Sequence, residues 1–164
     1  MFASQRLKRQ LLASRQRSAG LVGAIVSALR EVDPGATEAS LPALMASREF
    51  IAHLWDALPE ERHAYQFPTP EALVAGGAWC LAGLGNPRVT LHLGWGPLCF
   101  TCSLEAAWAA WPRFCSLSTD TFNAVAYPDT LDWALVRAGG KLFPLTLGRS
   151  SDAELMFEVG REST

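Results

Sequence analysis

The stretch that decides the fold spans residues 131–147 and reads LDWALVRAGGKLFPLTL. Two runs rich in branched and aromatic residues flank Gly139-Gly140, and a Gly-Gly turn between two such runs is typical of an antiparallel β-hairpin. Pro144 has no N–H group to donate to a neighbouring strand, so we expect the second strand to lie at an edge or to face solvent there. This part of the chain therefore predicts an antiparallel sheet.

A second hairpin is predicted upstream. Residues 88–93 alternate polar and apolar side chains, which is the period of a half-buried strand, and residues 98–102 form the return strand. Ser103 can cap a helix that ends before Pro112. Beyond it we expect a strand or short helix over residues 121–126, and a last short helix from residue 153 to about residue 159.

The N-terminal half is predicted to be helical, because apolar residues recur at helical spacing within residues 1–35, 41–58 and 70–84. The first of these helices is basic and amphipathic, and its thinly apolar first half could project from the body. Gly76-Gly77 weakens the third helix by about 1 kcal/mol per glycine and can let another element approach closely.

Taken together, the elements predict one α+β domain over residues 1–164. We expect the helical N-terminal half to pack on one face of an antiparallel sheet of four or five strands. Two hairpins with an intervening helix build that sheet. Helices and strands do not alternate strictly, which disfavours a parallel doubly wound sheet.

Charge is distributed unevenly along the 164 residues, although the net charge is only −2. Residues 1–30 carry six basic residues and no acidic one, whereas residues 31–63 carry seven acidic residues against two basic ones. A near-neutral chain gives no support for nucleic-acid binding by the whole surface. The basic helix is most simply solvated. Otherwise it docks on an acidic partner, on phosphate, or on the acidic segment of a second copy, which leaves a homodimer open.

Neither a membrane span nor secretion is expected. No run of about 18 apolar residues occurs. Residues 19–29 resemble the apolar part of a signal peptide, but a long basic segment precedes them and no A-x-A site follows. Four cysteines in 164 residues are too few for a disulfide scaffold, so we expect a reduced, cytoplasmic protein.

The motif Cys99-Phe100-Thr101-Cys102 is the strongest chemical signal in the sequence. A C-x-x-C at a helix N-terminus lowers the pKa of a thiol, because the helix dipole stabilises the thiolate. With a strand before it, a helix after it and Tyr127-Pro128 downstream, the segment loosely resembles a thioredoxin-type oxidoreductase. The resemblance implies a redox pair, but the 25 residues between Cys102 and Pro128 are few for that fold. If both cysteines lie on one strand, they point to opposite faces.

Metal and hydrolytic sites have weaker support. Structural zinc usually needs two close pairs of ligands, and the spacing of His92 and Cys115 does not make a second pair. His53, His63 and His92 have no carboxylate at a spacing that suggests a relay, and no G-x-S-x-G motif occurs. We therefore expect no metal and no cofactor.

The tryptophans offer candidate binding residues. Trp95 lies in a glycine-flanked turn, and an exposed Trp on a rigid hairpin tip is a common interface anchor. Equally, Trp95 can fold back on the sheet, since Trp is mostly buried. Trp111, before Pro112, is the second candidate, whereas Trp55, Trp79 and Trp108 are expected in the core.

These observations favour a non-enzymatic, cytoplasmic protein-binding protein, such as an inhibitor, an immunity-type factor or an adaptor that masks a macromolecular partner. The expected partner is a protein, and a basic protein would suit the acidic segment; nucleic acid is not the expected partner. The predicted binding residues are Trp95, Trp111, Glu49, Asp56, Glu60 and Glu61. The alternative is a small thiol–disulfide oxidoreductase that uses Cys99 and Cys102.

Overall fold

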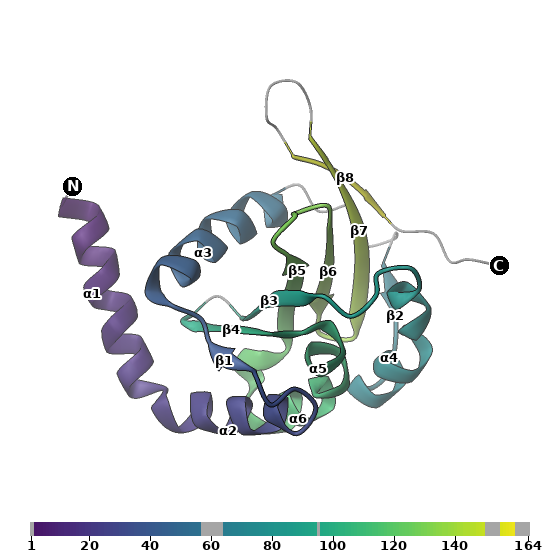
Figure 1. Ribbon diagram of the computed structural model, residues 1–164, viewed down its shortest axis with the longest axis horizontal. Helices are drawn as coiled ribbons and strands as arrows, with labels where there is room; N and C mark the ends of the chain where they lie inside the picture. Colours follow the sequence, from purple (N-terminus) through teal and green to yellow (C-terminus); the bar gives the residue numbers. More distant parts are fainter. Residues whose placement is uncertain (1, 57–63, 95, 150–154, 160–164) are drawn as a thin grey trace.

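The computed structural model describes residues 2–56, 64–94, 96–149 and 155–159 (Figure 1). Within these residues it contains six α-helices and one antiparallel sheet of eight strands, which confirms the α+β class. The sheet has more strands than predicted, partly because two strands are only two residues long and carry no sequence signal of their own.

The helices are α1 (Phe2–Arg17), α2 (Ala19–Arg30), α3 (Leu41–Asp56), α4 (Pro70–Gly76), α5 (Leu104–Ala109) and α6 (Trp111–Leu117), with short 3-10 helices η2 (Ala78–Leu81) and η3 (Thr119–Thr121). The strands are β1 (Thr37–Glu38), β2 (Tyr65–Gln66), β3 (Arg88–Leu93), β4 (Leu98–Ser103), β5 (Asn123–Pro128), β6 (Trp133–Ala138), β7 (Lys141–Arg149) and β8 (Leu155–Val159).

Both predicted hairpins are present in the sheet. Its strand order is β1-β4-β3-β5-β6-β7-β2, and β8 also pairs with β7. In the β6–β7 hairpin, Ala138 pairs with Lys141, and Gly139 adopts a φ of +62°, which a glycine accepts without strain. The β3–β4 hairpin pairs Leu93 with Leu98, so both hairpins close where the sequence predicted their turns.

The C-terminal prediction is wrong: residues 155–159 form strand β8 rather than a helix. They pair with β7, with Leu145 opposite Val159. Local periodicity cannot decide so short a segment, and pairing with a neighbouring strand can override it. The prediction for Pro144 is wrong in part. Pro144 is buried rather than solvent-facing, although it falls between the stretches of β7 that pair with β2 and with β8.

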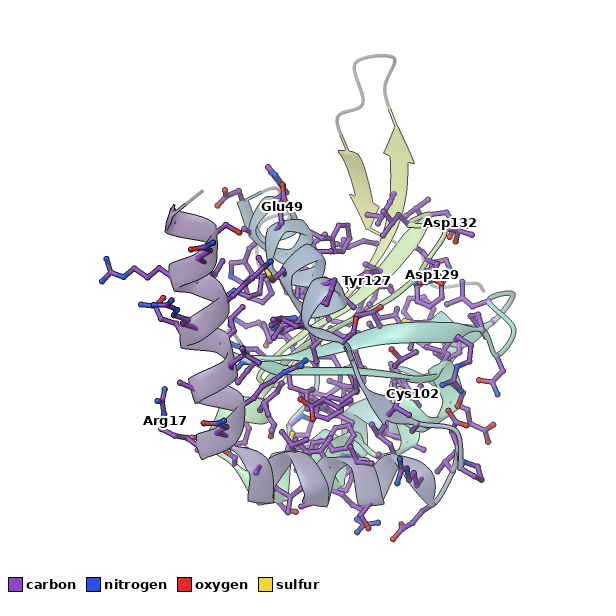
Figure 2. All side chains as sticks on the ribbon, turned by 60° about the vertical axis from the view of Figure 1, so that its left-hand side comes forward. Arg17, Glu49, Cys102, Tyr127, Asp129 and Asp132 are labelled. Atoms are coloured by element: carbon purple, nitrogen blue, oxygen red, sulfur yellow. The ribbon has the colours of Figure 1, made fainter. Side chains whose placement is uncertain are left out.

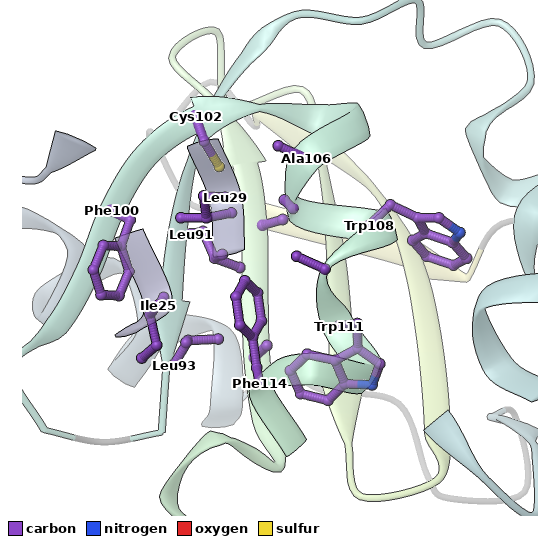
Figure 3. Packing of buried hydrophobic residues seen from close by; sticks show 14 of the residues in the cluster. Ile25, Leu29, Leu91, Leu93, Phe100, Cys102, Ala106, Trp108, Trp111 and Phe114 are labelled. Atoms are coloured by element: carbon purple, nitrogen blue, oxygen red, sulfur yellow. The ribbon is translucent and has the colours of Figure 1, made fainter. Parts of the chain in front are cut away.

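Helices cover both faces of the sheet, not one as predicted. Helices α2, α4, α5 and α6 pack on the first face, where Ile25, Phe100 and Phe114 belong to one buried cluster (Figure 3). Helices α1 and α3 cover the second face. The strands explain this arrangement, because β4, β5 and β6 carry apolar residues on both faces and both must be shielded from water.

The predicted basic helix over residues 1–35 is two helices that change direction at Ser18 (Figure 1). The predicted projection is also incorrect for the second half of α1, because Leu11 is buried against Leu44 of α3. Arg15 reinforces this contact through an ion pair with Glu38, at 2.9 Å. One face of α1 is therefore fixed to the body and the other faces solvent.

Glycine and proline move two helix boundaries. The third predicted helix ends early, and α4 stops at Gly76. A Cβ atom on Gly77 would lie 2.9 Å from Cδ2 of Leu142, so this glycine permits the close approach to β7. Pro112 does not end a helix; it lies in the first turn of α6, where its missing N–H costs nothing.

Candidate functional site

Trp111 is not a surface anchor, which corrects the sequence-based prediction. Its side chain is fully buried in the core of the first face (Figure 3). Trp111 is the first residue of α6, and its indole points inward, where it contacts Phe114 edge-on at a centroid distance of 6.5 Å. A partner protein therefore has no access to this indole.

Arg137 lies beside Trp111 and was not predicted to be buried. Its guanidinium carbon is 4.1 Å from the centroid of the Trp111 ring, and Nη2 donates a hydrogen bond to the Ala107 carbonyl at 3.2 Å. Nε and Nη1 have no hydrogen-bond partner among the described residues. Burial lowers the pKa of Arg137 to about 9. The sequence signal was present, because Arg137 occupies a core-facing position of β6, in register with Leu142.

Cys99 and Cys102 are separated by the sheet itself. Both lie on β4 and both are fully buried, but Cys99 joins the cluster of the second face and Cys102 that of the first. Burial raises the pKa of Cys99 to about 11 and that of Cys102 to about 12. Ser103 does cap α5, yet the thiols precede the cap on the strand, so the helix dipole does not activate them. This arrangement offers neither a disulfide partner nor a thiolate.

A buried polar cluster on the second face was also missed. The hydroxyl of Ser47 on α3 lies 2.9 Å from Nδ1 of His92 on β3, and it also hydrogen-bonds Cys99 and Tyr127. Nε2 of His92 lies 3.0 Å from the Gly96 carbonyl. A carbonyl only accepts, so Nε2 carries the proton and Nδ1 accepts from Ser47. Burial lowers the pKa of His92 to about 4.

The geometry of this cluster resembles the start of a serine–histidine relay, but the hydroxyl is enclosed. Ser47 is fully buried and His92 is 1% exposed. A hollow of about 120 Å³ touches His92 and Arg48 but is not lined by Ser47. The cluster thus joins α3 to β3 and to the turn that follows it, and burial keeps the His92 side chain neutral at pH 7.

Hydrogen bonds hold the β3–β4 turn on both sides of Trp95, which itself lies outside the described residues. The Gly94 N–H donates to the Asn123 carbonyl at 2.7 Å, and the Gly96 carbonyl accepts from His92. A cavity of about 430 Å³ lies beside this turn, against the bend between α1 and α2. Neutral polar side chains and apolar residues line it, including Ser14, Ser18, Leu21 and Asn123.

The predicted acids of α3 are exposed, while Glu60 and Glu61 lie outside the described residues. Figure 2 shows Glu49 pointing outward from α3. Asp56 is also exposed and follows Glu49 by seven residues, or two helical turns, so both lie on the same outward face of α3. Neither has an ion-pair or hydrogen-bond partner among the described side chains. This outward face of α3, marked by Glu49 and Asp56, is called the acidic face below.

The acidic residues nearer the N-terminus instead form ion pairs with basic residues of the same chain. Glu38 pairs with Arg15, Asp33 pairs with Arg88 at 2.6 Å, and Glu31 pairs with Arg113. These contacts tie the segment after α2 to α1, β3 and α6. The acidic segment seen in the sequence therefore divides into a paired part and an unpaired part on α3.

Across the described ranges, no group of three or more His, Cys, Asp or Glu side chains converges as metal ligands do. His92 and Cys115, the residues considered for zinc, lie on different faces of the sheet, because Cys115 packs on the first face. The helices that the structure describes include none with the length and apolar character needed to cross a bilayer.

Comparison with known proteins returned no family model that matches the chain, no curated protein that matches its sequence and no solved structure that matches its fold.

Proposed function

We propose that this chain is a non-enzymatic protein-binding protein, an inhibitor, immunity-type factor or adaptor, that masks a basic protein with the acidic face of α3. One observation carries the proposal. The carboxylates of Glu49 and Asp56 are exposed and unpaired within the described residues, whereas Cys99, Cys102 and the Ser47–His92 pair lie in the core. Complementary charge steers encounter and fixes orientation at such interfaces.

The buried groups support this assignment. Ser47, His92 and Cys99 hydrogen-bond one another or the backbone. Ser47 and Cys99 are fully buried and His92 is 1% exposed, so these side chains offer almost no surface to a substrate. The cysteines are all free thiols, which supports the proposed cytoplasmic location.

The test is capture of the partner from an extract of the source organism, followed by quantitative mass spectrometry. The variant E49K/D56K reverses both charges of the acidic face. The matched control E71K/D129K makes the same change in net charge at exposed positions elsewhere. We expect one basic protein to be recovered by the wild type and the control, and to fall at least about tenfold with E49K/D56K.

Equal recovery by both charge-reversed variants would contradict the proposal. So would failure to recover any protein that saturates the wild-type chain. Retention of the fold in each variant is checked by its urea-unfolding midpoint, since exposed substitutions of this kind change stability by only about 0.5 kcal/mol.

A further inference from the structure

The outward face of α1 carries positive charge that the chain does not neutralise. Arg6, Lys8, Arg9 and Arg17 are all exposed, and none pairs with an acid among the described residues. Arg15 differs, because it turns inward to Glu38. Neither α1 nor α2 contains an acidic residue. We call this surface, defined by Arg6, Lys8, Arg9 and Arg17, the basic face.

The acidic face of α3 has the opposite charge and a shape that another helix can approach. Ala46 and Ala52 are exposed beside Glu49 and Asp56, and small side chains let two helices come close. On α1, Leu12 is 46% exposed, which makes it one of the few large apolar side chains left in water. It can supply an apolar contact between the charged residues.

The two faces cannot neutralise each other within one molecule. Helix α1 packs beside the start of α3 through Leu11 and Leu44, so both helices lie on the same side of the sheet. Figure 2 shows Arg17 and Glu49 pointing out from these helices, and no ion pair among the described residues joins the two faces. A second copy related by a two-fold axis places its acidic face against the basic face of the first, and the reverse contact forms at the same time.

We propose that the chain self-associates as a two-fold dimer in which the basic face of α1 contacts the acidic face of α3 of the second copy. The two-fold axis repeats every favourable pairing. The alternative two-fold contacts, α1 on α1 or α3 on α3, oppose like charges. This dimer covers the acidic face that the proposed function assigns to a basic partner, so the partner and the second copy compete, but the dimer does not depend on that partner.

Sedimentation velocity of the full chain over a micromolar concentration series tests the proposal. The screening length falls from about 30 Å at 0.01 M salt to about 3 Å at 1 M. We expect a dimer at low salt and a monomer at high salt. The variants R6E/R9E and E49K/D56K each place like charges across the interface, and each weakens association at least about tenfold.

Mixing the two variants gives the decisive result. In the mixed pair, the acidic α1 of R6E/R9E meets the basic α3 of E49K/D56K, and the second contact keeps its natural partners. We expect the mixture to restore the dimer although neither variant forms one alone, and we expect E71K/D129K to associate like the wild type.

Three results would overturn the dimer: a wild-type monomer throughout the series at low salt, unchanged association in either variant, or a monomeric mixture. Capture of the basic partner by R6E/R9E separates this proposal from the proposed function. R6E/R9E keeps the acidic face of α3 unchanged. If the dimer exists, this variant loses it and partner capture rises; if the dimer does not exist, partner capture stays as in the wild type.

Discussion

At the scale of single residues, His92 makes the stability of the fold depend on pH below neutrality. Its folded pKa of about 4 lies below the ordinary value of 6.5, because burial disfavours the imidazolium and Arg48 adds repulsion. The unfolded chain therefore binds a proton that the folded chain excludes. Stability is complete above the unfolded pKa and declines as the pH falls from about 6.5 towards about 4.

We expect the free energy of unfolding to fall by about 3 kcal/mol across that window, since one pKa unit corresponds to about 1.4 kcal/mol. Urea unfolding at a series of pH values measures this loss. The substitution H92Q removes the titrating group, so its stability should depend much less on pH between 6.5 and 5. An equally steep decline in H92Q would show that His92 is not the group responsible.

The four cysteines should react with a thiol reagent in the order of their exposure. Cys99 and Cys102 are fully buried, whereas Cys80 and Cys115 are half-buried. In the native protein we expect iodoacetamide to label Cys80 and Cys115 first, and to label Cys99 and Cys102 only on unfolding, because buried thiols with raised pKa values react slowly. Peptide mapping after timed labelling measures the order. A Cys99–Cys102 disulfide after mild oxidation of folded protein would contradict the placement of the two thiols on opposite faces.

Arg137 is a buried cation with no carboxylate beside it in the described structure. The indole contact with Trp111 and one backbone hydrogen bond offset only part of its desolvation. We expect R137M, which keeps the length of the side chain, to be neutral or to stabilise the protein by about 1 kcal/mol.

The comparison variant R137A leaves a void and should lose about 2 to 5 kcal/mol. Urea unfolding of both variants gives the answer. A loss above about 2 kcal/mol in R137M would mean that Arg137 stabilises the native state through a partner that a methionine cannot replace.

At the scale of elements, the strands that alternate strongly or flank a glycine turn were predictable. The β3–β4 and β6–β7 hairpins appear where the sequence places them, and Thr69 and Ser103 cap the helices that follow them. Short elements were not predictable, because β1 and β2 owe their conformation to pairing with strands distant in sequence, and β8 owes its conformation to pairing with the preceding strand β7.

The residues of the candidate site were also only partly predictable from the sequence. Glu49 and Asp56 were identified because a helix with one buried stripe must expose the opposite side. Trp111 was misplaced, since Pro112 suits either the end of one helix or the start of another. His92 was expected on a polar strand face, but α3 covers that face and no pattern within β3 reveals it.

Alanine substitutions at two glycines are expected to change the free energy of unfolding in opposite directions. A Cβ on Gly140 would lie 2.4 Å from the Phe67 carbonyl oxygen, at the contact that joins the end of β2 to β7. We therefore expect G140A to destabilise the protein by about 1 to 3 kcal/mol.

Gly23 lies within α2, and a Cβ atom added to it would meet no other side chain or strand within 4 Å. We therefore expect G23A to stabilise the protein by up to about 1 kcal/mol. Thermal and urea unfolding of the pair measure both effects. A neutral G140A or a destabilising G23A would contradict the packing at these two positions.

At the scale of the whole molecule, an antiparallel sheet is enclosed by helices on both faces, and this places different kinds of side chain in the core and on the surface. Cys99, Cys102 and His92 lie beneath the helices, while the unpaired charges of α1 and α3 lie on the outer faces of these helices. Small-molecule catalysis needs reactive groups at an accessible cavity. Recognition of a macromolecule needs an outer surface, which this arrangement provides.

The most direct test compares two double variants in one measurement, partner capture from native extract quantified by mass spectrometry. C99S/C102S removes both thiols of the motif, and E49K/D56K reverses the acidic face. We predict that the captured basic protein remains with C99S/C102S and disappears with E49K/D56K. The opposite pattern, loss with the cysteine variant and retention after charge reversal, would contradict binding through the outer face of α3 and would assign function to the thiols.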